Sequence, residues 1–243
     1  MTTLRRAVSM HWHDLLFAHW RIDAAVLRPH GPMPLSIETF DGSAWIAVVP
    51  FRMARVRARF MPPLPLLSAF PELNLRTYVT HGGRAGVWFF SLDAAQPLAV
   101  RVARRGFSLP YFDAEMRCAL RTDGGVEYSS ERTHRGVVPA SLRCSYRPVG
   151  APFRALQGSL EHFLCERYSL FARDRKGRIL RGDIEHEPWP LQRAEWDVER
   201  CAMTALLDHR LQGAPESLLF ARELRVWAAL PVPSEAQSQG SSC

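Results

Sequence analysis

The chain has 243 residues, of which 47% are hydrophobic and 23% charged, so it is long enough to bury a substantial core in one large domain or two small ones. Its formal net charge is +7, but Lys176 is the only lysine among 31 basic residues and the arginines are spread along the whole chain, which disfavours nucleic acid as a partner. No apolar run reaches the roughly 20 residues of a membrane span, and the first residues lack the apolar segment of a signal peptide, so we expect a soluble, cytoplasmic protein with no membrane partner.

The segment HWHDLLFAHW, near the start, is compatible with a short helix or with the first strand. In a strand, His11 and His13 share a face and are a candidate pair of metal ligands. A catalytic zinc site needs a third protein ligand, however, and no HExxH motif accompanies the pair. A helix places Trp12, Leu16 and Trp20 on one face, so we interpret the segment as packed aromatic structure and predict no metal site.

Turn signals separate pairs of short apolar runs at four places along the chain. They are Asp41-Gly42, Gly82-Gly83, Asp123-Gly124-Gly125 and the segment from Asp174 to Gly177. Such pairs are typical of tight turns between neighbouring antiparallel strands. We therefore predict that antiparallel hairpins dominate the fold.

Arginines alternate with apolar residues in VPFRMARVRARF, at Arg55, Arg57 and Arg59. We interpret them as the exposed basic face of a strand. They are also the residues through which a nucleic-acid or protein interaction module would act.

A second alternation, in PELNLRTYV, carries more chemical information. Glu72, Asn74, Arg76 and Tyr78 are separated by apolar residues and Thr77, so the two sets face opposite sides of a strand. The polar set is either a solvated face or the lining of a barrel interior. In a barrel, Arg76 is suited to hold a carboxylate, and hydrogen bonds from Asn74 and Tyr78 would orient the ligand.

Two helices are expected. Residues 93–105 have Asp93 as the predicted N-cap and Pro97 in the first turn, and residues 157–166 have Ser159 as the predicted N-cap. The polar tail from Ser234 to Cys243 is expected to be disordered, which leaves residues 1–233 as a single domain.

Glu185, His186 and Glu187 form a candidate acid/base group or a rigid strand exit before a Pro-Trp-Pro run.

Several chemical motifs are absent from the sequence. Neither GxSxG nor a phosphate-binding GxxxxGK[ST] motif occurs, which disfavours serine hydrolases and nucleotide-dependent enzymes. The five cysteines are odd in number and far apart, which argues against a disulfide framework and a CxxC metal site. We predict no cofactor.

These elements together predict an α+β fold in which a large antiparallel sheet curls toward a barrel and is flanked by a few helices. Seven stretches in order also resemble the YqjF-like family of uncharacterised bacterial proteins: LLFAHWRID, ETFDGSAWIAVVPF, ELNLRTYV, GVWFFSLDA, ARRGFSLPYF, FLCERYSLF and HEPWPLQRAEW. The resemblance covers roughly Met10 to Val232. Because that family is grouped by fold with acetoacetate decarboxylase, it implies a cone-like barrel around a central cavity.

The resemblance also says which chemistry to exclude. Acetoacetate decarboxylase forms a Schiff base through one lysine of a neighbouring pair, and the two positions correspond here to Tyr111 and Phe112. Lys176 lies in a predicted turn, so we do not expect a Schiff-base decarboxylase. The resemblance implies that Arg21 matches an active-site arginine of the decarboxylase at the cavity mouth.

We therefore expect a cavity protein that binds a small organic ligand, possibly a carboxylate. The residues expected to bind it are Arg21, Asn74, Arg76, Tyr78, Trp88 and Tyr111. The alternative is an enzyme of different chemistry in the same pocket, with Tyr111 as a general acid or Glu72 as a base. A homo-oligomer is compatible with the sequence.

Overall fold

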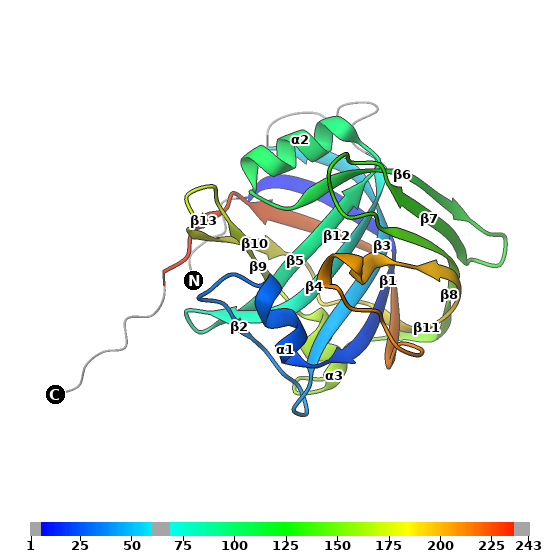
Figure 1. Ribbon diagram of the computed structural model, residues 1–243. Helices are drawn as coiled ribbons and strands as arrows, with labels where there is room; N and C mark the ends of the chain where they lie inside the picture. Colours follow the sequence, from blue (N-terminus) through cyan, green and yellow to red (C-terminus); the bar gives the residue numbers. More distant parts are fainter. Residues whose placement is uncertain (1–5, 60–68, 236–243) are drawn as a thin grey trace.

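The computed structural model describes residues 6–59 and 69–235, and these residues form one large curled sheet with a few short helices (Figure 1). The strands are β1 (Arg6–Ile22), β2 (Ser36–Ile37), β3 (Ala44–Ala58), β4 (Phe70–His81), β5 (Arg84–Ala94), β6 (Tyr111–Leu120), β7 (Val126–Arg132), β8 (Ser141–Phe153), β9 (Ser169–Arg173), β10 (Ile179–Glu185), β11 (Leu191–Cys201), β12 (Ser217–Ala229) and β13 (Val232–Pro233). The helices are α1 (Ala24–Leu27), α2 (Pro97–Gly106) and α3 (Leu160–Cys165), with 3-10 turns η1 (Arg28–His30) and η2 (Met203–Leu207). The predicted fold class is confirmed.

Strand pairing closes part of the sheet into a ring. Following the hydrogen-bonded neighbours, the ring runs β1-β3-β4-β5-β9-β10-β12 and returns to β1. The strands β6, β7, β8 and β11 form a flank that connects β5 to β12 outside this ring. The β5–β9 and β5–β6 pairs are parallel, and the other pairs are antiparallel. Closure pairs the backbone groups that an open sheet would leave at its edges.

Three of the four predicted hairpins form as expected. Gly82 and Gly83, both at positive φ, join β4 to β5, and the turns before Val126 and Ile179 join β6 to β7 and β9 to β10. Glycine fits these turns because it adopts positive φ without steric cost.

The fourth turn forms, but it does not join two paired strands. Phe40 and Ser43 exchange backbone hydrogen bonds of 2.9 and 3.1 Å across Asp41-Gly42. However, β2, which precedes this turn, pairs with β4 and not with β3. The local signal predicted the turn correctly, whereas the partner of the short strand depends on contacts that are distant in the sequence.

The first segment of the chain is a long strand, so the helical interpretation is wrong. β1 lies between β12 and β3, and its ladder is irregular at Asp14, which has a φ of 56°. Trp12 faces inward against Phe51, while His11 and His13 face the opposite side. The two paired neighbours satisfy the backbone of this segment, and that long-range pairing overrides its local helical spacing.

One helix begins as expected and the other begins later. Ser159 caps α3 by accepting a hydrogen bond from the backbone of His162. For α2 the cap is Gln96, and the helix starts at Pro97. Asp93 is instead a fully buried residue of β5 that pairs with Arg132. The prediction of Asp93 as a cap is wrong because a buried ion pair from a distant strand holds its carboxylate.

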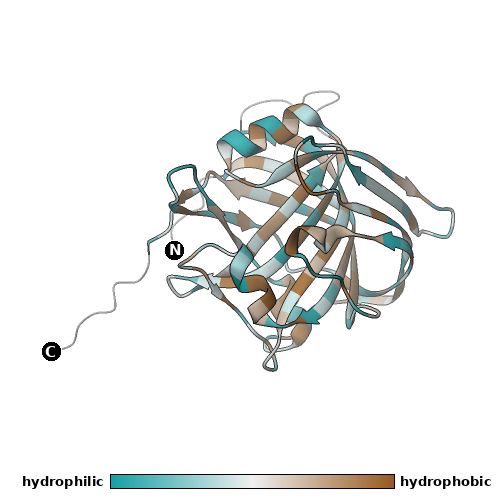
Figure 2. Ribbon diagram, viewed as in Figure 1, coloured by the Kyte–Doolittle hydropathy of each residue, from teal (hydrophilic) through white to brown (hydrophobic). Residues whose placement is uncertain are grey.

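Hydrophobic and hydrophilic residues alternate along several strands (Figure 2). The buried residues form two main clusters. The first cluster lies inside the ring and includes Phe17, Phe51 and Trp189. The second includes Leu73 and Leu75 together with residues of the flank such as Tyr128, Leu142 and Tyr146. α2 lies over one end of the ring, beside β6 (Figure 1).

Three sequence-based expectations concern the chain as a whole. No helix within residues 6–59 and 69–235 is long and apolar enough to cross a membrane. The four cysteines in these ranges are free thiols, and Cys243 lies outside them. The predicted disordered tail begins at Ser234, whose backbone N–H donates to the carbonyl of Ile179, and its residues 236–243 lie outside the described residues.

Candidate functional site

A cavity of about 460 Å³ lies inside the ring, and every strand of the ring contributes to its wall. Most of the lining is apolar, from β1, β3, β5 and the inner side of α2. The polar side chains that line it are Arg57, Glu72, Asn74, Arg76, Tyr111, Arg167 and Ser169. The volume is in the range of small-molecule sites, which are typically apolar pockets with a few fixed polar groups.

The polar residues of β4 lie on the inner face of the ring. Glu72 and Asn74 are buried, with exposures of 2% and 5%, and Arg76 lines the cavity beside them. Leu73 and Leu75, on the opposite face of β4, are fully buried in the second hydrophobic cluster. Because both faces of β4 are covered, the interpretation of a solvated polar face is wrong.

Arg76 forms no ion pair with any acidic side chain of the described residues. Its Nη2 donates a long hydrogen bond of 3.4 Å to the carbonyl of Leu164, and its Nε is buried without a partner. The guanidinium lies 5.4 Å from the ring centre of Phe17. The Oδ1 of the neighbouring Asn74 is also buried without a partner. Buried polar atoms without partners are costly, so this part of the wall is suited to a polar ligand.

The second arginine of the wall is neutralised by the protein itself. Arg167 forms an ion pair with Glu38 and donates to the carbonyl of Phe163. Arg167 is thus held by structural contacts, whereas the charge of Arg76 has no counterion.

Glu72 and Tyr111 form a hydrogen-bonded pair in the wall of the cavity. The Tyr111 hydroxyl donates to Oε2 of Glu72 over 2.9 Å, and both side chains are buried. Burial raises the pKa of Glu72 to about 8, against the opposing effect of the Tyr111 hydrogen bond. Burial also raises the pKa of Tyr111 well above its usual value. Glu72 is therefore a neutral carboxyl group near neutral pH.

A second buried pair lies behind Glu72. Asp93 Oδ1 accepts from Nε of Arg132 over 2.9 Å, and Arg132 also lies 4.5 Å from the ring centre of Phe112. Burial raises the pKa of Asp93 to about 6 in spite of Arg132. The charge of Asp93 adds to the burial effect that raises the pKa of Glu72.

Tyr78 lies beside the cavity but does not line it. It is fully buried, and its hydroxyl is 2.8 Å from Nε2 of His19. Burial lowers the pKa of His19 to about 3 and raises that of Tyr78 to about 12, so both are neutral. The ring centre of Tyr78 lies 5.8 Å from Cζ of Arg76, so the ring packs beside the guanidinium.

Two other sequence candidates, Trp88 and Arg21, lie away from the cavity. Trp88 lines an open groove of about 850 Å³ on the outside, with Lys176 on its rim. Arg21 is exposed, donates to Oγ of Ser43 and lies 4.7 Å from the ring centre of Trp45. Neither Trp88 nor Arg21 lines the cavity.

The remaining candidate groups have structural partners. The Nδ1 of His186 is 2.7 Å from the carbonyl of Glu187, and its ring stacks on Tyr168. Arg55 and Arg57 are exposed on β3, and Arg57 donates to Oγ of Ser9. Within the described ranges, one group of side chains has the spacing of metal ligands, and it lies outside the cavity.

Some residues of the site carry no signal in the sequence. Arg167 and Ser169 reach the cavity from the segment after α3, and Asp93 reaches Glu72 from the end of β5. Only the folded ring brings these positions together with β4. The regular alternation of β4 was the one local pattern that pointed to the site.

The comparisons with known proteins agree with this architecture. The model of the DUF2071 family, described as an uncharacterized conserved protein, matches residues 9–225. The chain belongs to the DUF2071 family. A relative described as uncharacterized, YqjF of Bacillus subtilis (strain 168), is 46% identical over 224 residues, which cover 89% of this chain and 91% of that protein.

Solved structures show the fold of this DUF2071 member. An acetoacetate decarboxylase-like enzyme from Sphingomonas wittichii RW1 matches with a TM-score of 0.60 and 16% identity, covering 96% of this chain and 95% of the other. An acetoacetate decarboxylase from Legionella pneumophila has a TM-score of 0.63 and 10% identity, covering 98% and 91%. The enduracididine biosynthesis enzyme MppR in complex with pyruvate has a TM-score of 0.60 and 11% identity, covering 97% and 93%. The acetoacetate decarboxylase-like fold implied by the sequence is confirmed.

Proposed function

We propose that the cavity binds a small organic acid, with its carboxylate against Arg76 and its hydrocarbon part against the apolar walls. The observation that carries the proposal is the guanidinium of Arg76, which lines an apolar cavity without an acidic partner among the described residues. Charged groups in low-dielectric surroundings are costly unless paired, and arginine matches a carboxylate with two parallel hydrogen bonds.

The neighbouring groups favour an anion over a cation. Arg167 is already paired with Glu38, so it adds little net charge, and Glu72 is neutral near pH 7. Of the arginines that line the cavity, Arg57 is exposed to solvent, so Arg76 is the one that carries an uncompensated charge away from the surface among the described residues. The unpartnered amide oxygen of Asn74 favours a ligand that also carries a hydroxyl or another donor close to its carboxylate.

A relative by fold supports this ligand class. MppR, which shares the fold, has been solved with pyruvate, a small 2-keto acid. The low sequence identity limits this support to the architecture, so the choice of acid must come from a screen.

Thermal shift with a graded set of acids tests the proposal. Short 2-keto acids, 2-hydroxy acids, aromatic acids and aliphatic acids of increasing length are compared, each with the corresponding uncharged alcohol or methyl ester. A ligand present at about 100 times its Kd stabilises the folded state by about 2.7 kcal/mol, so at least one acid is expected to raise Tm while its neutral counterpart does not.

The matched variant is Arg76→Met, which keeps much of the side-chain volume and removes the charge. We expect it to fold and to lose the stabilisation by acids, because hydrogen bonds to charged groups contribute about 1.5–3 kcal/mol. Equal stabilisation of the variant and the original protein by the same acid would contradict the role of Arg76. A screen in which no acid raises Tm would contradict the proposal itself.

A second candidate function is proton transfer to and from the bound acid, and the Glu72–Tyr111 pair favours it. A buried carboxyl group with a raised pKa, close to a ligand cavity, is typical of acid/base catalysis. In this function Glu72 exchanges protons with the ligand, and the Tyr111 hydroxyl fixes its orientation.

Hydrogen exchange in D₂O tests this second function. With pyruvate as the probe, Glu72 would remove a methyl proton as a carboxylate and return a deuteron, which NMR detects as loss of the methyl signal. The rate is expected to rise as pH increases toward about 8, because the carboxylate form is then more populated. Glu72→Gln should abolish this exchange and Tyr111→Phe should slow it. A rate equal to that of buffer alone would rule out this chemistry for pyruvate.

A further inference from the structure

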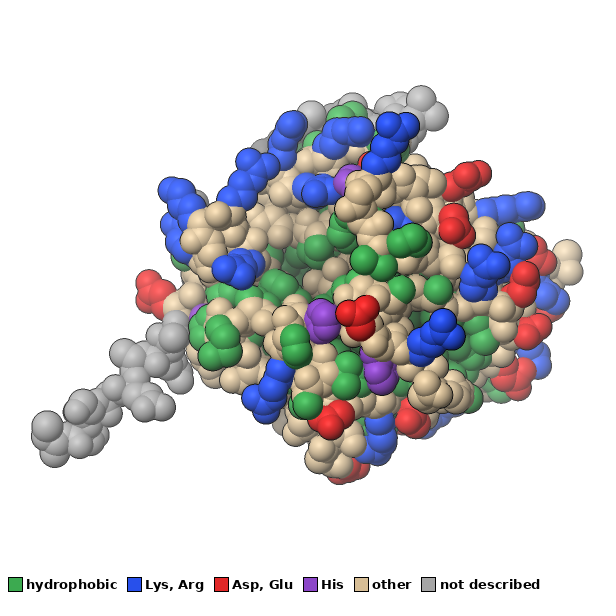
Figure 3. Space-filling model, in the orientation of Figure 1, with side chains coloured by type: hydrophobic (Ala, Val, Ile, Leu, Met, Phe, Trp, Pro, Cys, Tyr) green, Lys and Arg blue, Asp and Glu red, His purple; other side chains and the backbone are tan. Residues whose placement is uncertain are grey.

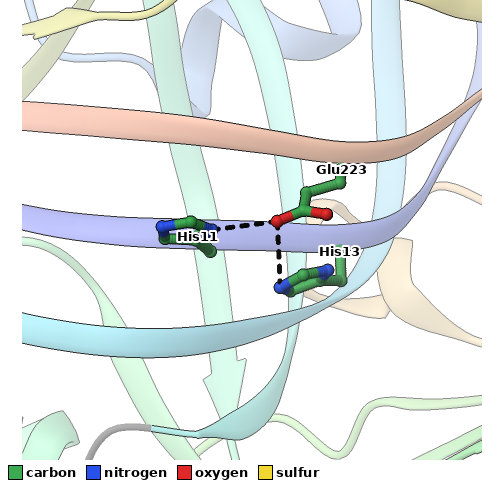
Figure 4. A group of neighbouring side chains, drawn as sticks. All are labelled: His11, His13 and Glu223. Carbon is green, nitrogen blue, oxygen red and sulfur yellow. Dashed lines mark hydrogen bonds and ion pairs between the residues drawn. The ribbon is translucent and has the colours of Figure 1, made fainter.

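We propose that His11, His13 and Glu223 form a binding site for a divalent transition-metal ion on the outer face of the β1–β12 pair. Figure 4 shows the three side chains pointing toward one another from the two neighbouring strands. The sequence showed the two histidines, but the third ligand is more than two hundred positions away. The site therefore becomes visible only when β12 pairs with β1.

The strand register fixes the three residues on one face. His11 and His13 are two residues apart on β1 and therefore project to the same side. Glu223 of β12 is directly opposite His13, in a ladder without irregularity between Ser9 and His13. Trp12, between the two histidines, is packed inward against Trp189 and anchors this part of β1.

The distances between the ligand atoms suit one ion. Nδ1 of His11 is 3.0 Å and Nε2 of His13 is 3.9 Å from the same oxygen of Glu223, and all three atoms lie within 4.8 Å of one another. Ligands bound tetrahedrally to zinc at about 2.0–2.1 Å are separated by about 3.4 Å. Small side-chain rotations would therefore bring the three atoms into one coordination sphere.

The ligand chemistry and the exposure point to the kind of ion. Two imidazoles and one carboxylate suit Zn²⁺, Ni²⁺ or Cu²⁺ better than the oxygen-preferring Mg²⁺ or Ca²⁺. The side chains are 22%, 20% and 54% exposed, so water can reach the remaining coordination positions.

The surrounding charges leave the site available. Arg52, the other cross-strand neighbour of His13, is directed to Asp14 at 3.5 Å, and Arg222 lies 2.6 Å from the same carboxylate. Asp14 thus pairs with both of these arginines, and neither forms an ion pair with Glu223, on which the charge of Arg55 also acts.

Isothermal titration of the metal-free chain with ZnCl₂ at pH 7.5, without a polyhistidine tag, tests the proposal. We expect one bound Zn²⁺ per chain and an increase in Tm on saturation. His13→Gln and Glu223→Gln should each weaken binding by at least about tenfold, since even the outer partners of metal ligands change affinity by about 10–100-fold.

The control is His209→Gln, which removes a histidine outside the group and should bind zinc like the original protein. Tm without metal is measured for each variant, so that a loss of folding is not mistaken for a loss of the site. Absence of zinc binding would overturn the proposal, and so would unchanged binding by a folded His13→Gln variant, because the zinc would then be held by cysteines or other histidines.

Discussion

At the scale of single residues, the cavity combines an arginine without a counterion and a carboxyl group without a charge. Arg76 and Glu72 are on the same face of β4, yet Glu72 accepts from Tyr111 and forms no ion pair with Arg76 in the described structure. If Glu72 neutralised Arg76, the wall would offer no net charge to a ligand. The separation of the two groups is therefore what makes an anion the expected occupant.

The raised pKa of Glu72 predicts a stability change with pH. The unfolded chain loses this proton near the ordinary value of about 4.5, whereas the folded protein keeps it until about pH 8. The contribution of Glu72 to stability is therefore complete below about pH 4.5 and decreases as pH rises to about 8, by up to about 1.4 kcal/mol per pH unit.

Glu72→Gln removes this titration. The free energy of unfolding of the variant, measured by urea denaturation from pH 5 to pH 8, should fall less steeply with pH than that of the original protein. Asp93, whose pKa is also raised, and His19, whose pKa is lowered, titrate in both proteins, so the difference reports on Glu72. Parallel curves would show that Glu72 is already ionised in the folded protein.

The position of Lys176 predicts that no imine forms. Lys176 is exposed in the turn between β9 and β10, on the rim of the outer groove, and the two positions matched to the decarboxylase lysines are Tyr111 and Phe112. Incubation with acetoacetate and borohydride should therefore leave the mass of the protein unchanged. A reduced adduct mapped to Lys176 would show that the turn reaches a substrate.

At the scale of elements, the sequence predicted the hairpins well because their turns require glycine at positive φ, which is a local constraint. It also predicted the alternation of β4, of which Glu72, Asn74 and Arg76 line the cavity, whereas Tyr78 does not. It left β1 open between a short helix and the first strand, because helical spacing and strand pairing were both compatible with HWHDLLFAHW, and the strand alternative is the correct one. It placed Trp88 at the site, although Phe89, the next residue, is the one that faces the cavity, because the register of β5 depends on its irregular ladder with β4.

The parallel contact of β5 with β9 closes the ring, and Gly86 makes it possible. A Cβ at Gly86 would lie 2.6 Å from the carbonyl oxygen of Ser169 and 2.8 Å from Phe171. Because the oxygen belongs to the backbone of β9, it cannot move aside without breaking the ladder. Gly86→Ala is expected to cost at least about 1–3 kcal/mol of folding stability, measured by urea denaturation.

Gly106→Ala is the matched control. A Cβ at Gly106, the last residue of α2, meets no atom within 4 Å, and its φ is not positive. This substitution should leave stability unchanged or raise it by up to about 1 kcal/mol. Similar losses in both variants would mean that the β5–β9 contact is not the reason why position 86 requires glycine.

At the scale of the whole molecule, the basic charge does not form one continuous surface on the face in view. Figure 3 shows blue side chains along the upper edge, over α2, and blue mixed with red on the right. Several arginines are paired with acids, as Arg6 is with Glu185 and Arg147 with Glu195.

The closed ring predicts that the protein unfolds as one unit. Each strand of the ring pairs on both sides, and the flank from β6 to β11 is joined to the ring at both of its ends, at β5 and at β12. Residues 1–233 should therefore behave as a single domain, as expected from the sequence.

Buried tryptophans in both hydrophobic clusters, Trp45 and Trp20 among them, report on tertiary structure, while far-ultraviolet circular dichroism reports on the sheet. The two signals should give the same midpoint in urea. Separate midpoints would show that the flank unfolds independently of the ring and that the chain contains two folding units.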